Sequence, residues 1–324
     1  MKKKIFIIMI FVIIFTTGCK KDIGIKGGDL VTFKNKDLTI TSNDLYNILK
    51  EKYGTSTMID LIDTKILDKE YPDSDSISEY VNTQISSIKN YYKTEAEFLQ
   101  YINNYGYKTE DDLREYFKLN YKRNLAVEDY LKSNLTDEEI KKFYDESISG
   151  DITGSHILVE VNASSSATEE EKRTAKEEAL NKAKEAIEKL NNGTSFAEVA
   201  KEYSTDDATK NNGGKQGTFN SLDLDDVTRQ AYAKLEVGKY STEPVETEYG
   251  YEIFYKEEEK EKPSLESVKS KIEKKLVDQK LTNDSKLQYK GLMAIREKYG
   301  FSIQDEDLKV YYENTMNNLL KDEQ

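Results

Sequence analysis

The sequence predicts an α+β protein, with mostly helical segments on either side of a compact centre that holds a small antiparallel sheet. Apolar residues recur at helical spacing through residues 29–146 and again after residue 263. Between them, strands and helices follow in the order strand, three helices, two strands, which implies a small antiparallel sheet with helices around it. The length of 324 residues fits about two domains.

Composition excludes several classes of protein. Apolar residues make up 37% and charged residues 34% of the chain, which is enough for packed cores under solvated helices. The single Cys and single His exclude a disulfide framework, a Cys-rich zinc site and a multi-His centre, so we expect no metal. The net charge of −13 argues against nucleic acid as a partner, because phosphate contacts need clustered Lys and Arg.

The N-terminus predicts an export signal rather than a domain. Lysines at residues 2–4 precede an apolar run over residues 5–15, which is shorter than the about 20 residues that a spanning helix needs. Residues 16–19 read Thr-Thr-Gly-Cys and resemble a bacterial lipobox, with Thr16 where Leu is usual. Cys19 would then be the lipidated first residue of the mature chain. An ordinary buried or free thiol is the alternative.

We therefore expect a lipoprotein signal peptide over residues 1–18 and a lipidated tether over residues 19–28. Two acyl chains bind a membrane stably where one does not, so a diacyl group on Cys19 would anchor the protein to the outer face of the cell membrane. An exported chain with one Cys forms no internal disulfide, which fits a Gram-positive cell surface.

The N-terminal segment, residues 29–146, is expected to be mostly helical after strands at residues 30–33 and 38–40. A hydroxyl at residue 41 or 42 caps a helix that we expect to end at Gly54. Further helices follow at residues 58–67 and 77–131, with capping boxes at Thr109 and Thr136. The many tyrosines are interpreted as half-buried packing, and a contact surface for another protein is the alternative.

The centre, residues 147–258, predicts the sheet, and a helical C-terminal segment follows at residues 259–324. We expect a strand at residues 155–161, helices that begin at a cap at 168–193 and 195–203, and a loop at 204–217. A short helix at residues 225–235 and a closing strand at 249–255 follow. The charge run at residues 256–262 is interpreted as a solvated linker. Two more helices are expected at residues 263–281 and 303–320.

Short motifs follow one another in a fixed order through the centre. They read SHILV at 155–159, FAEVAKEYS at 196–204, GG at 213–214, GTF at 217–219, GKYS at 238–241 and TEYGY at 247–251. This ordered set resembles the parvulin family of peptidyl-prolyl cis–trans isomerases. The resemblance implies rotation of X-Pro bonds with no cofactor, in a parvulin-like domain at residues 147–258.

The flanking segments resemble the chaperone parts of the foldase family that includes PrsA and SurA. The matching stretches are residues 38–54, residues 136–144 and the helix after the centre. The resemblance implies that residues 29–146 and 259–324 pack together as one helical chaperone domain, with the parvulin-like domain inserted. Its partners would be unfolded exported proteins, whose folding it would assist after translocation. A homodimer is an open alternative to a monomer.

The resemblance also implies four catalytic residues. His156 matches the first of the family's two histidines, and Asp206 matches the position that holds Cys or Asp. Thr247 lies in the motif that enters the last strand. Where the second histidine is expected, this chain has Glu252.

Three residues are expected to bind the proline ring. Phe219 fits the family's Gly-x-Phe position, Leu224 falls near its pocket Met, and Tyr232 stands in an altered Ala-Phe pair. One pocket Phe lacks a clear equivalent, because Val227 or Thr228 falls at its position.

Two functions remain open on the sequence. In the first, Glu252 accepts a hydrogen bond from His156, favours the protonated ring, and the isomerase site works in altered form. In the second, His156 is a satisfied core histidine, and the protein is a holdase whose parvulin domain is a weak or inactive peptide-binding module. A solute-binding lipoprotein is a third alternative, which the lack of alternating α/β lobes disfavours.

Overall fold

The computed structural model describes residues 28–35, 38–164 and 166–321, in two compact units. The first unit is built from residues 1–134 and 277–324, and the second from residues 135–276. The expected signal peptide and Cys19 lie outside the described residues, as does the tether apart from Gly28. Among the residues described, no helix is both long enough and apolar enough to cross a lipid bilayer.

The first unit is helical, with one two-stranded hairpin. Its elements are β1 (Asp29–Val31), β2 (Ile40–Thr41), α1 (Ser42–Glu70), α2 (Asp75–Lys89), α3 (Glu95–Asn104), α4 (Glu110–Ser133), the end of α9 (Leu265–Asn283), α10 (Leu287–Tyr299) and α11 (Glu306–Leu320). Capping boxes begin α1 at Thr41 and α4 at Thr109. The expected packing role of the tyrosines is confirmed, because Tyr80, Tyr101 and Tyr121 pack half-buried against a core of α2, α3 and α4.

The predicted helix end at Gly54 is wrong, since α1 continues through this glycine. A Cβ atom at Gly54 would lie 2.8 Å from Leu308 Cδ2 of α11. The glycine therefore allows α11 to pack closely on α1, and its lower helix propensity is outweighed by that packing. A second glycine, Gly291, lies where α10 meets α4, with its added Cβ 3.1 Å from Val127 Cα. The sequence did not predict α10, because glycine weakens the helical pattern there.

A buried ion cluster joins helices from the two ends of the chain. Asp63 of α1 is 1% exposed. Its Oδ1 lies 2.7 Å from Arg296 Nε of α10, and its Oδ2 lies 2.8 Å from Arg123 Nε of α4. Arg123 also donates to Asp60, with 2.6 Å between Nη2 and Oδ1. The charge of Asp63 thus compensates two buried guanidinium groups, and α1, α4 and α10 are held together by it.

The second unit is built around a five-stranded antiparallel sheet. Its elements are α5 (Asp137–Ser147), β3 (Ile152–Glu160), α6 (Glu169–Asn191), α7 (Phe196–Tyr203), η2 (Lys210–Asn212), β4 (Lys215–Phe219), η3 (Ser221–Asp223), α8 (Asp226–Lys234), β5 (Lys239–Tyr240), β6 (Val245–Thr247), β7 (Gly250–Glu259) and the start of α9. The strand order is β4-β3-β7-β5, and β6 also pairs with β7. The predicted capping boxes at Thr136, Thr168 and Ser195 are confirmed.

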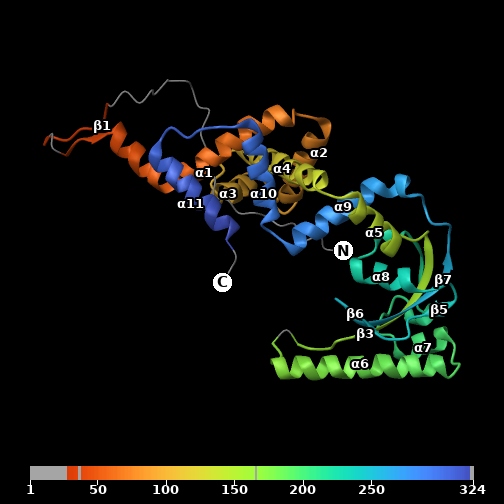
Figure 1. Ribbon diagram of the computed structural model, residues 1–324. Coiled ribbons are helices and arrows are strands. Elements are labelled where there is room, and N and C mark those ends of the chain that lie inside the picture. Colours follow the sequence, from red (N-terminus) through yellow and green to blue (C-terminus); the bar gives the residue numbers. More distant parts are fainter. Residues whose placement is uncertain (1–27, 36–37, 165, 322–324) are drawn as a thin grey trace. The chain divides into compact units, whose positions relative to one another are not determined.

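The two faces of this sheet pack against different helices. Side chains alternate along β3 and β7, so Ile157 and Ile253 share one face and pack under α6 and α7. His156 and Phe254, which are paired in the register, lie on the opposite face, where α8 packs (Figure 1). The sheet therefore presents His156 toward the α8 side, away from its main apolar core.

Two boundaries differ from those expected. The predicted loop at residues 204–217 contains the start of β4, which pairs with β3. The charge run at residues 256–262 is not all linker, because β7 continues to Glu259 and Lys256 is 2% exposed. In both places tertiary pairing overrides a polar, turn-like local sequence.

Candidate active site

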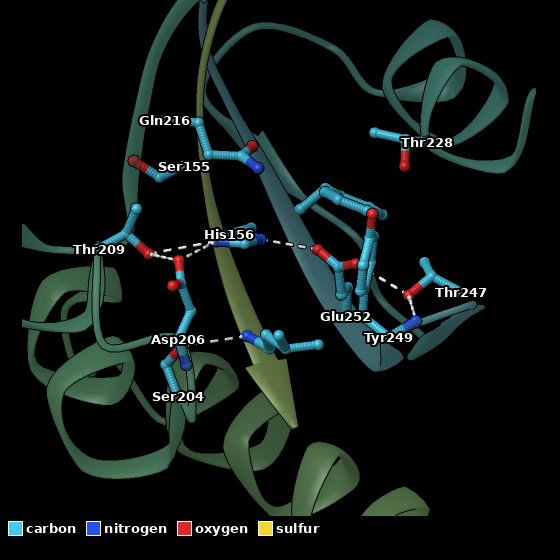
Figure 2. A network of polar contacts seen from close by, with 12 residues as sticks. Ser155, His156, Ser204, Asp206, Thr209, Gln216, Thr228, Thr247, Tyr249 and Glu252 are labelled. Carbon is cyan, nitrogen blue, oxygen red and sulfur yellow. Dashed lines mark hydrogen bonds and ion pairs between the residues drawn. The ribbon is translucent and has the colours of Figure 1, made fainter. Parts of the chain in front are cut away.

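His156 lies near the middle of β3 and is 8% exposed. Its Nδ1 is 2.7 Å from Glu252 Oε2 on β7, and its Nε2 is 2.9 Å from Asp206 Oδ2 in the loop after α7 (Figure 2). Because His156 pairs with Phe254 in the register, Glu252 is its diagonal neighbour on the same face. The imidazole thus lies between two carboxylates from different parts of the chain.

Two threonines complete the network at its ends. Thr247 of β6 donates from Oγ1 to Glu252 Oε1 at 2.9 Å. Thr209 donates to Asp206 Oδ2, and its Oγ1 lies 3.2 Å from His156 Nε2. The structure therefore brings together His156, Asp206, Glu252 and Thr247, and it adds Thr209, which the sequence did not single out. The only feature of the sequence that pointed to Thr209 was its position three residues after Asp206.

The electrostatics favour a charged network. Burial by itself lowers the pKa of His156, but hydrogen bonds to Glu252 and Asp206 outweigh it and raise that pKa above 6.5. Burial raises the pKa of Asp206, but hydrogen bonds from Thr209 and His156 lower it below 3.8 overall. The contribution of His156 to stability is thus fully present below its unfolded pKa and is lost as pH rises through the folded one. The contribution of Asp206 to stability is present above its unfolded pKa and is lost as pH falls through its folded pKa.

The expected proline-binding residues share one apolar cluster beside this network. Phe219 and Leu224 pack half-buried against Tyr232 and Phe254. Ring centroids are 5.2 Å apart for Phe219 and Tyr232, and 5.0 Å apart for Tyr232 and Phe254. Tyr232 is fully buried, so it lies beneath the half-buried side chains rather than among them. Phe254 belongs to the cluster but was not predicted from the sequence.

Tyr232 is also held by polar contacts. Its hydroxyl lies 2.8 Å from Gln216 Oε1 and 3.2 Å from the carbonyl oxygen of Ser155. A Cβ atom at Gly154 would lie 2.6 Å from the same hydroxyl, so glycine there leaves the room that the ring needs. Of the two residues at the position of the missing pocket Phe, Thr228 is buried and Val227 is 44% exposed.

Comparison with known proteins gives a consistent result. Residues 156–258 match the PPIC-type PPIase domain family, also called rotamase. The foldase protein PrsA of Geobacillus kaustophilus is 31% identical over 309 residues, covering 95% of this chain and 97% of that protein. Foldase protein PrsA 2 of Listeria monocytogenes is 33% identical over 287 residues, covering 87% of this chain and 86% of that protein.

Solved structures agree with these relatives. The crystal structure of the peptidylprolyl isomerase PrsA from Bacillus cereus superposes with a TM-score of 0.54 at 29% identity, covering 91% of this chain and 99% of that chain. The predicted α+β fold and the predicted resemblances to parvulins and to PrsA are confirmed. The chain belongs to the PrsA foldase family and contains a parvulin-type peptidyl-prolyl cis–trans isomerase domain.

Proposed function

We propose that the protein assists the folding of exported proteins, and that His156, Asp206, Glu252 and Thr247 form the centre that isomerises their X-Pro bonds. The observation that supports this centre is a buried imidazole with a carboxylate on each ring nitrogen, next to an apolar cluster. Glu252 then takes the place of the family's second histidine as the hydrogen-bond partner of His156. Unfolded exported chains are the proposed substrates.

The chemistry requires a twisted amide and no nucleophile. Rotation about a peptide C–N bond is slow because resonance gives it partial double-bond character, with a barrier of about 18–20 kcal/mol. Resonance also places negative charge on the carbonyl oxygen, and twisting removes that charge. A carboxylate near this oxygen therefore disfavours the planar amide relative to the twisted transition state.

Asp206 is the carboxylate suited to that role. Its side chain is 23% exposed, whereas that of Glu252 is 6% exposed, so Asp206 can face a bound peptide while Glu252 holds His156 from behind. Phe219 and Leu224 would contact the proline ring, and Tyr232 would form the floor beneath them.

The first prediction concerns turnover. Replacing Asp206 by Ala is expected to lower kcat/KM for a proline-containing tetrapeptide about tenfold or more, which corresponds to about 1.4 kcal/mol of transition-state stabilisation. Glu252→His, which restores the usual family residue, is expected to retain activity. Both are measured on the full chain by protease-coupled isomerisation. A parent protein with no turnover above background, and an active Glu252→His variant, would instead favour the holdase alternative.

The helical segments are proposed as the chaperone part. We assign residues 29–146 and 259–324 to one chaperone module, and residues 147–258 to the parvulin-like domain inserted in it. The cluster of Asp63, Arg123 and Arg296 supports the joining of the two helical segments. Suppressed aggregation of a denatured client by the protein without residues 150–258 is the expected result, and unchanged aggregation would contradict it.

Residues 1–18 are proposed as a lipoprotein signal peptide and Cys19 as the lipidated residue, with residues 19–28 as the tether. The sequence pattern of cationic, apolar and lipobox-like stretches supports this assignment. The protein would then lie at the outer face of the cell membrane of a Gram-positive bacterium. Cys19→Ser is expected to abolish palmitate labelling and to release the protein into the medium. A labelled, membrane-bound Cys19→Ser variant would disprove the anchor.

A second copy of the chain is proposed as a further partner. The β1–β2 hairpin and the first turns of α1 expose large apolar side chains, and a two-stranded sheet is marginally stable without cover. The exposed residues are Leu30, Val31, Phe33, Leu38, Ile40, Leu45, Tyr46, Ile48 and Leu49. Light scattering is expected to give the mass of two chains for the parent and for Val237→Ser, an exposed control, but one chain for Ile48→Ser with Leu49→Ser. A monomeric parent would contradict the proposal.

A further inference from the structure

We propose that Thr209 is a positioning residue of the isomerase site, which holds the Asp206 carboxylate against the His156 ring in one arrangement of protons. The inference rests on the proposed catalytic role of Asp206 and His156. No motif of the sequence pointed to Thr209, and it is the loop after α7 that brings its hydroxyl to the network (Figure 2).

The Asp206 carboxylate is held from several directions. Oδ2 accepts from Thr209 and lies 2.9 Å from His156 Nε2, while Oδ1 accepts from the backbone N–H of Ala208 at 3.1 Å. The backbone N–H of Asp206 donates to Ser204 Oγ at 3.3 Å. The N–H of Lys210 donates to the carbonyl of Asp206 at 2.9 Å, which closes the turn that carries Thr209. Thr209 supplies the hydroxyl contact that touches both the carboxylate and the imidazole.

The donors and acceptors agree with an assignment of protons in which both carboxylates are anions. A threonine hydroxyl has one proton to give, and an ionised carboxylate only accepts. With Thr209 donating to Asp206 and Thr247 donating to Glu252, both carboxylates are satisfied as anions. Each ring nitrogen of His156 then faces an anionic acceptor, so the ring is satisfied when it carries both protons. The two threonines thus close the network at its two ends.

Two phenols near Glu252 do not change this balance. Tyr232 of α8 and Tyr249 of the turn before β7 both interact with the charge of Glu252, and the pKa of each is raised, Tyr232 by burial and Tyr249 by the charge of Glu248. Both phenols are therefore neutral near pH 7. Asp206 and Glu252 remain as the charges that set the protonation of His156. Without the Thr209 hydroxyl, the Asp206 carboxylate is free to turn away from Nε2, and Nε2 loses the hydroxyl oxygen that lies 3.2 Å from it.

The test uses the fact that His156 is the one histidine of the chain, so its ring signals in NMR spectra are unambiguous. The full chain is compared with Thr209→Val, which removes the hydroxyl at similar volume, and with Thr209→Ser, which keeps it. Thr209→Val is expected to move the titration of His156 to lower pH and to lower kcat/KM about threefold to tenfold, the range of one hydrogen bond. In the pH–rate profile the loss of activity at high pH moves in the same direction. Thr209→Ser is expected to match the parent in both measurements.

Two results would overturn the proposal. One is a His156 titration that is the same in Thr209→Val and the parent. The other is an equal loss in the Val and Ser variants, which would assign Thr209 a packing role. Failure of the proposed catalytic centre is a separate outcome, seen as undiminished turnover in His156→Ala. The NMR titration tests the positioning role of Thr209 independently of turnover.

Discussion

Replacing Asp63 by Ala is expected to lower the free energy of unfolding of the helical unit by about 3–5 kcal/mol, the usual cost of removing one partner of a buried ion pair. Asp63 is 1% exposed and compensates the guanidinium groups of both Arg123 and Arg296. Arg123 keeps Asp60 as a partner, but among the residues that the structure describes Arg296 contacts no carboxylate other than Asp63. A buried cation without its anion is the main source of the loss.

The control for this variant is Asp68→Ala in the same helix. The Asp68 side chain is 52% exposed, and its partner Lys122 keeps a second ion pair with Asp73. Lys122 itself is 1% exposed, but Asp73 remains beside it, so no buried cation is left without an anion. A loss of about 1 kcal/mol, smaller than for Asp63→Ala, is therefore expected. Urea unfolding of the full chain, followed by far-UV circular dichroism, measures both variants. Equal losses in the two would show that Asp63 does not hold the helices together.

The Asp63 variant also separates the two activities. Asp63, Arg123 and Arg296 all belong to the helical unit, whereas His156 and Asp206 belong to the second unit. We expect Asp63→Ala to weaken the suppression of client aggregation and to leave prolyl isomerase turnover nearly unchanged. Loss of both together would indicate that the units do not fold independently.

The polar network around His156 was predictable where the sequence pattern is regular. The strand motif around His156 and the motif before Glu252 place both side chains on paired strands, and the structure joins them at 2.7 Å. Asp206 was found through the resemblance to parvulins alone, because nothing in a polar loop shows which carboxylate faces the sheet. Thr209 was missed for the same reason, since its role depends on how the loop turns back.

The elements that were missed depend on contacts distant in sequence. The N-terminal part of β4 looks like a loop, and pairing with β3 makes it a strand. Helix α1 continues through Gly54 and α10 forms around Gly291 because another helix packs against each glycine. Local propensity argues for a break at both glycines, and tertiary packing decides otherwise. Burial of Asp63 was likewise invisible, because its two arginine partners come from distant helices.

Gly214→Ala is expected to destabilise the second unit strongly, although it adds only one methyl group. Gly214 has φ +78°, and its carbonyl oxygen accepts from the His156 N–H at 2.8 Å. An added Cβ would lie 2.2 Å from the His156 carbonyl oxygen, which is backbone and cannot rotate away. Left-handed strain and overpacking each cost about 1–3 kcal/mol, so we expect a loss of about 2–6 kcal/mol. Because the clash falls on His156 itself, turnover is expected to fall too.

Gly217, three residues on and within β4, offers the matched control. It has φ +85°, close to that of Gly214, but an added Cβ meets nothing within 4 Å. Gly217→Ala therefore incurs the left-handed strain of about 1–2 kcal/mol without the clash, and the His156 site keeps its geometry. Urea unfolding, turnover and the NMR signals of His156 compare the pair. If both variants lose stability and turnover equally, backbone strain alone explains the effect. A larger loss in Gly214→Ala would instead show that the close contact between Gly214 and the His156 backbone sets the position of the imidazole ring.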